Sequence, residues 1–139
     1  MSYAPIPPEV EAVARSVVDA GFRVHEALGP GLLESAYEHC LAYELERRGR
    51  HVLRQVALPI VYDAVKLDAG YRIDLLVADA IVVEIKSVES LAPIHQAQLL
   101  TYLKLAQRSL GLLINFNVPV LKEGIHRVAF GELFKGDRH

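Results

Sequence analysis

The stretch YRIDLLVADAIVVEIK, residues 71–86, decides how this chain folds. It contains two apolar runs of strand length, and residues 78–80 separate them. This pattern predicts a β-hairpin. Side chains alternate between the two faces of a strand, so a three-residue loop would place Asp74 directly opposite Glu84. Lys86 follows two positions later, on the face of Glu84.

The hairpin carries ionisable side chains inside apolar strands, where they are costly unless they are paired or bind a metal. Two facing carboxylates, here Asp74 and Glu84, repel each other, which raises a pKa or calls for a cation. Oxygen ligands suit Mg²⁺ or Mn²⁺. Lys86 could polarise a water molecule or stabilise charge that develops on a phosphate. The pattern therefore indicates a divalent-metal site, while a buried ion-pair network without a catalytic role stays open.

Alternation in the first strand places Arg72 and Asp74 on one face and Ile73 and Leu75 on the other. Arg72 has two interpretations at this position. It could hold a substrate phosphate, or it could neutralise Asp74 or Glu84. Both stay open.

The pattern of apolar residues around the hairpin predicts helices and further strands. The expected helices are 9–28, 32–48 and 93–107. The expected strands are 52–62 with 66–67, then 70–77, 80–88, 111–116 and 125–130. Pro59 interrupts the first of these, which indicates an edge strand. The order predicts an α/β fold, a central mixed sheet flanked by helices, with residues 81–85 in a central strand.

Composition limits the classes of protein to which the chain can belong. Of its 139 residues 52% are apolar, so we expect a folded globule, and without repeats or linkers we expect one domain over 1–139. No apolar run reaches membrane-spanning length, and residues 1–5 do not resemble a secretory signal. The single cysteine, Cys40, fits a cytoplasmic location. The net charge of −2 disfavours tight, non-specific binding of long duplex DNA.

Three motifs, one in the hairpin and two outside it, resemble those of a known protein superfamily. Asp74, ten residues before Glu84-Ile85-Lys86, resembles the PD-(D/E)xK nuclease signature. The later pair Gln98-x-x-x-Tyr102 is similar to the RecB-like branch of that superfamily. The segment GLLESAY, residues 31–37, resembles the motif that names the GxxExxY protein family. The likeness covers about residues 10–130 and implies a restriction-endonuclease-like core.

The resemblance also implies a set of metal ligands. Glu34 on the first core helix would join Asp74 and Glu84, and the backbone carbonyl of Ile85 would be a further ligand. Lys86 would position the attacking water. Glu34 also lies in the first turn of its predicted helix, where a carboxylate is favourable without any function, so that interpretation stays open.

Gln98 and Tyr102 lie four residues apart, on one face of the predicted helix. The resemblance implies that they act with the catalytic residues by orienting Lys86 or by binding substrate phosphate. They could equally tie the helix to the sheet. Tyr37, in the GxxExxY segment, is interpreted as a core residue.

The function predicted from these residues is a Mg²⁺- or Mn²⁺-dependent nuclease that hydrolyses phosphodiester bonds with a metal-activated water. An alternative is a catalytically silent module of nuclease fold that binds nucleic acid or a protein partner. A third is an enzyme that acts on small phosphate-containing substrates in a closed pocket. A groove lined by Arg47, Arg48, Arg54 or Lys104 would favour nucleic acid, either DNA or RNA. A homodimer is compatible with so short a chain.

Overall fold

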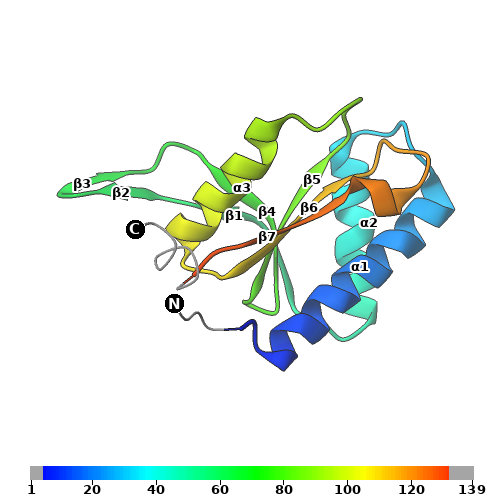
Figure 1. Cartoon of the computed structure of the whole chain (residues 1–139), viewed down its shortest axis with the longest axis horizontal. Helices are drawn as coiled ribbons and strands as arrows, with labels where there is room; N and C mark the ends of the chain where they lie inside the picture. The colour runs from blue at the N-terminus through cyan, green and yellow to red at the C-terminus, as the bar shows by residue number, and fades with distance from the viewer. Residues whose placement is uncertain (1–4, 132–139) are drawn as a thin grey trace.

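The computed structural model describes residues 5–131, which form helices on both sides of a sheet (Figure 1). The helices are α1 (Pro8–Leu28), α2 (Glu34–Arg47), α3 (Pro93–Ala106) and the 3₁₀ turn η1 (Leu121–Gly124). The strands are β1 (Val52–Ala57), β2 (Ile60–Tyr62), β3 (Val65–Leu67), β4 (Arg72–Val77), β5 (Ile81–Lys86), β6 (Leu110–Asn115) and β7 (Ile125–Ala129). None of the helices within residues 5–131 combines the length and the apolar character that a membrane crossing needs.

The main sheet has five strands in the order β1-β4-β5-β6-β7. β5 and β6 are parallel, and α3 connects them, whereas the other neighbouring strands are antiparallel. β5 lies in the middle of this order, as its apolar sequence predicted. The prediction of an α/β fold with a mixed sheet is thereby confirmed.

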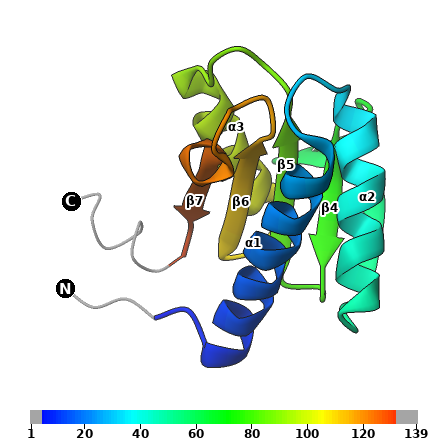
Figure 2. The ribbon, with the colours of Figure 1, turned by 90° about the vertical axis from the view of Figure 1, so that its right-hand side faces the viewer.

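Two apolar cores hold the layers together. α1 and α2 cover one face of the sheet, with Val17 and Leu41 among the fully buried residues between them and β5 (Figure 2). α3 covers the opposite face, where Leu99 and Leu103 pack against residues of β4, β5 and β6. The central strand is therefore buried on both sides, which places the candidate residues of β4 and β5 between two helical layers.

The predicted strand 52–62 is wrong as a single element. β1 ends at Ala57, and the chain leaves the main sheet to form β2 and β3, a separate two-stranded arm that projects beyond α3 (Figure 1). The Leu58 N–H still bonds the Tyr71 carbonyl at 2.9 Å. Pro59 follows, and a proline has no N–H with which to continue the ladder, so the pairing with β4 stops there.

Candidate active site

The β4–β5 hairpin has the predicted register. Leu75 pairs with Val83 and Val77 with Ile81, so the turn is residues 78–80. Continuing this register by one residue brings Asp74 opposite Glu84.

Each of these two carboxylates accepts a hydrogen bond from the backbone of the neighbouring strand. The Asp74 N–H donates to Glu84 Oε2 at 3.0 Å. The Ile85 N–H donates to Asp74 Oδ2 at 2.8 Å. The side chains thereby fill the gap where β4 and β5 separate, and they hold the two carboxyl groups next to each other.

The alternation predicted for β4 breaks at Asp74. Ile73 packs in the core beneath α3, whereas Leu75 packs in the core beneath α1 and α2. The two residues therefore do not share a face, contrary to the prediction. The carboxylate–backbone bonds replace regular β4–β5 pairing at this point.

Burial and nearby negative charge disturb the ionisation of the pair. Glu84 is only 5% exposed. Burial raises its pKa to about 8, and the charge of Asp74 adds to the rise. Burial also raises the pKa of Asp74, against the Ile85 hydrogen bond, which lowers it. Without a cation the pair holds a proton at neutral pH, whereas a bound cation would favour two ionised carboxylates.

Glu38 of α2 is a third carboxylate of this site, and sequence reasoning missed its role. It is 7% exposed. Arg54 contacts its Oε2 at 2.8 and 3.1 Å, and Gln55 Nε2 donates to its Oε1 at 2.8 Å. The same Gln55 nitrogen lies 3.4 Å from Asp74 Oδ1. The charge of Glu38 is also among the causes that raise the pKa of Asp74 and Glu84, after burial.

Glu34 lies one helical turn before Glu38, at the first residue of α2. Its Oε2 accepts a hydrogen bond from the Ser87 N–H at 3.2 Å, and Ser87 Oγ donates to the Leu32 carbonyl at 2.6 Å. These bonds join the start of α2 to the end of β5, directly after Lys86. The metal-binding role of Glu34 stays a prediction.

Lys86 acts electrostatically on the two carboxylates, whereas Arg72 forms no salt bridge with them within residues 5–131. The charge of Lys86 lowers the pKa of both Asp74 and Glu84, although burial outweighs it. Arg72 is exposed, and in the described part of the chain it makes no salt bridge. Of the two interpretations given to Arg72, neutralisation of the pair has no contact to support it.

Gln98 and Tyr102 share one face of α3, as predicted, and line a cavity of about 310 Å³ together with Tyr71. Neither side chain bonds Lys86 within residues 5–131, so the structure gives no sign that they orient it. Burial raises the pKa of the Tyr102 hydroxyl, and the charge of Glu84 adds to the rise. Tyr102 therefore lines this cavity and is near enough to Glu84 for its hydroxyl to be affected by that charge.

Most of the arginines proposed to line a nucleic-acid groove are engaged within the chain. Arg47 bonds Glu44 at 3.1 Å, and Arg54 bonds Glu38. The Lys104 ammonium lies 5.9 Å from the centre of the Phe130 ring. Arg48, which follows α2 as its C-cap, has no ion-pair partner in the region that the structure describes.

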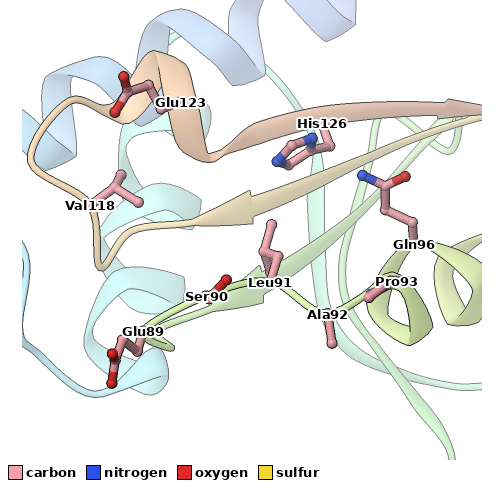
Figure 3. A pocket seen from close by; sticks show the side chains of 9 residues that line it. All are labelled: Glu89, Ser90, Leu91, Ala92, Pro93, Gln96, Val118, Glu123 and His126. Carbon is pink, nitrogen blue, oxygen red and sulfur yellow. The ribbon is translucent and has the colours of Figure 1, made fainter.

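A second cavity, of about 460 Å³, lies between the segment after β5, the start of α3 and the turn before β7 (Figure 3). The carboxylates of Glu89 and Glu123 lie toward one end of it, and His126 and Gln96 lie toward the other (Figure 3). None of the predicted site residues lines this cavity, so the larger hollow is not the candidate site.

The donor set at Asp74 and Glu84 fits a hard divalent cation. Within residues 5–131 no group of three or more His, Cys, Asp or Glu side chains is arranged to hold a metal ion. Mg²⁺, however, is usually bound through one or two carboxylates, and waters and substrate phosphates complete its shell. Two adjacent carboxyl groups with raised pKa values, Glu84 buried and Asp74 half-buried, meet that requirement.

The chain matches one known family. A sequence profile of the PD-(D/E)XK nuclease superfamily aligns with residues 11–128. No curated protein and no solved structure gives a significant match. The matched range runs from α1 to β7, so it includes every candidate residue described above.

Proposed function

The chain belongs to the PD-(D/E)XK nuclease superfamily, and from this premise we propose that it hydrolyses phosphodiester bonds of nucleic acid at Asp74, Glu84 and Lys86. The observation that carries the proposal is the adjacent pair of carboxyl groups, Glu84 buried and Asp74 half-buried. Burial raises the pKa of both, and the charge of Asp74 further raises that of Glu84. Such a pair is costly to the fold unless it serves a cation.

Nucleases of this superfamily generally use divalent metals, and we propose Mg²⁺ or Mn²⁺ here. Asp74 and Glu84 would hold the ion, together with the Ile85 carbonyl and Glu34 from α2. When bound, a divalent ion lowers the pKa of a water molecule and neutralises charge on the reacting phosphate.

The side chains around the pair have separate tasks in this proposal. Lys86 holds the attacking water and stabilises negative charge on the phosphate. Gln55 bridges Glu38 and Asp74, so it fixes the orientation of the Asp74 carboxylate. Gln98 and Tyr102 contact the substrate from α3, and Arg72 binds a neighbouring phosphate. These tasks together position the substrate and keep water ordered at the site.

We further propose that the chain is a GxxExxY-type member of the RecB-like branch and that residues 1–139 form one nuclease-like domain. The segment GLLESAY at residues 31–37 supports the first proposal, because it places Glu34 at the junction of α2 and β5.

A binding module without catalysis is the second candidate function. The observation that favours it is the limited positive charge: the net charge is −2, and five of the nine arginines within residues 5–131 form salt bridges with carboxylates.

Cleavage of labelled single- and double-stranded DNA and RNA in Mg²⁺ or Mn²⁺ tests the two functions. We expect wild-type cleavage, and a loss of at least about 100-fold in Asp74→Asn, Glu84→Gln and Lys86→Ala, because the first two remove a ligand of the metal ion and the third removes the group that stabilises charge on the phosphate. Asp63→Asn makes the same chemical change in the turn of the β2–β3 arm and should leave the rate unchanged. Binding without cleavage by the wild type would favour the second candidate.

A further inference from the structure

The cavity beside the candidate active site has an apolar and aromatic lining. Its walls include Tyr71 and Ile60 on one side and Ile94, Gln98 and Tyr102 of α3 on the other. Its volume of about 310 Å³ is at the lower end of the range for small-molecule sites. Apolar and aromatic linings of this kind are typical of pockets that bury most of a ligand's surface.

Two tyrosine rings shape the entrance and the inner wall. Tyr71 and Tyr102 lie 6.4 Å apart between ring centres, with their planes at 67°. Tyr71 is 43% exposed, whereas Tyr102 is 8% exposed. The edge-to-face contact therefore holds Tyr71 in place and leaves part of its ring open to a ligand.

The cavity lies close to the candidate active site. Tyr71 precedes Asp74 by three residues along the same segment, and the negative charges of Glu84 and Asp74 act on the Tyr102 hydroxyl. Arg72 is exposed beside Tyr71 and makes no salt bridge within the described residues. An aromatic surface, a cation for a phosphate and a site for the reacting phosphate thus follow one another along residues 71–74.

We propose that this cavity receives an unpaired nucleobase of the strand that is cut, so that the substrate is single-stranded or locally unpaired nucleic acid. The inference rests on the proposed function and names its substrate class. In an intact duplex both faces of each base are stacked, and a base must leave the stack to enter a pocket. A single strand offers free base faces, and base–tyrosine stacking adds affinity without selecting a sequence.

Fluorescence anisotropy with a short labelled oligonucleotide, as DNA and as RNA, tests this in Mn²⁺ at one fixed ionic strength. Lys86→Ala serves as the background, so that binding is measured without turnover. We expect the single strand to bind more tightly than its blunt duplex. Tyr71→Ala should weaken single-strand binding by roughly tenfold, the value of one stacking contact, and Tyr71→Phe should bind as Tyr71 does.

Two further variants test whether the cavity itself, rather than any exposed tyrosine, is responsible for the binding. Ala97→Phe fills the cavity from the exposed side of α3 and leaves both tyrosines intact, and it should weaken binding as Tyr71→Ala does. Tyr62→Ala removes an exposed tyrosine of the β2–β3 arm, outside the cavity, and should bind like the background protein. On an abasic strand of the same length, Tyr71→Ala should have no further effect.

Equal or tighter binding of the duplex would overturn the inference, and so would equal effects of Tyr71→Ala and Tyr62→Ala. Absence of all oligonucleotide binding would overturn it as well. The cavity would then be interpreted as a binding site for an apolar side chain of a protein partner. The binding result does not depend on cleavage. A protein that binds as expected but never cleaves would therefore contradict the nuclease proposal alone.

Discussion

At the scale of single residues, Glu84 sets how stability depends on pH. Its pKa is raised from 4.5 to about 8, chiefly by burial and then by the charge of Asp74. Between these values folded Glu84 keeps its proton while the unfolded chain releases it, so stability falls as pH rises through this window. Lys86 and Glu38 also act on Glu84, the first lowering and the second raising its pKa.

We therefore expect the metal-free protein to lose several kcal/mol of unfolding free energy between pH 5 and pH 8, and Glu84→Gln to flatten that profile. Urea unfolding in EDTA at a series of pH values measures the unfolding free energy of both proteins. Adding Mn²⁺ should stabilise the wild type more at the upper end of this range, because protons compete with the metal for the carboxylates. A flat wild-type profile would contradict the raised pKa.

Gln55 combines a functional contact with an unfavourable backbone. Its φ is +53°, a left-handed conformation that costs a non-glycine residue about 1–2 kcal/mol. Gln55→Gly and Gln55→Ala both lose the bridge between Glu38 and Asp74, so their difference isolates the backbone cost. Urea unfolding should show the glycine variant to be more stable by about 1 kcal/mol. Equal stabilities would mean that this conformation carries no strain.

At the scale of elements, Tyr37 fixes the start of α2. It is fully buried and stacks on Phe116, with ring centres 4.5 Å apart. Its hydroxyl donates to the Gly29 carbonyl at 2.6 Å and accepts from the Leu32 N–H at 3.1 Å. The loop between α1 and α2 is thereby pinned to the core, and this loop sets where Glu34 begins α2.

Tyr37→Phe should cost about 1–3 kcal/mol, because two backbone groups of this loop lose their partner while the ring still packs. Chemical denaturation measures the loss. Tyr43→Phe, on the exposed face of the same helix, is the matched control and should change stability by less than about 0.5 kcal/mol. A loss in Tyr37→Phe no larger than in this control would show that the hydroxyl does not hold the loop.

Sequence reasoning predicted the elements that depend on local pattern. The facing of Asp74 and Glu84 follows from two apolar runs and a three-residue turn, which are all visible in the sequence. The β2–β3 arm was missed because Pro59 shows where a ladder is interrupted but not whether the chain returns to the same sheet. Local pattern thus gave the register, and only tertiary contacts gave the path of the chain.

The candidate site was predicted less completely, because several of its contacts join elements that are distant in the sequence. Glu38 lies in the apolar stripe of α2 with Leu41 and Leu45, and a carboxylate in such a stripe was an available signal. Its partners, Arg54 and Gln55, come from β1, and no local pattern reports that pairing. The left-handed conformation of Gln55 and the broken alternation of β4 also arise only once β1, β4 and α2 have packed together.

At the scale of the whole molecule, positive charge is limited. The net charge is −2, and Arg47, Arg54 and Arg127 are among the arginines within residues 5–131 that pair with carboxylates. Binding that depends on two or three phosphate contacts, with Arg72 and Lys86 among them, releases few counterions.

We therefore expect the logarithm of the single-strand binding constant to fall with the logarithm of salt concentration with a slope of about −2. Anisotropy titrations over a range of salt concentrations measure it, and Arg72→Ala should make the slope shallower by about 0.7. A slope steeper than about −5 would instead indicate a broad basic surface, in conflict with the paired arginines.

The measurement that tests the central claim most directly is calorimetric titration of Mn²⁺ into the wild type and into the double variant Asp74→Asn/Glu84→Gln. It is made with and without a short phosphorothioate oligonucleotide that resists hydrolysis. We predict saturable heat of metal binding in the wild type and in Asp63→Asn, and its loss in the double variant. Equal binding by wild type and double variant, or no binding by the wild type even with the oligonucleotide present, would contradict a metal site at this pair of carboxylates.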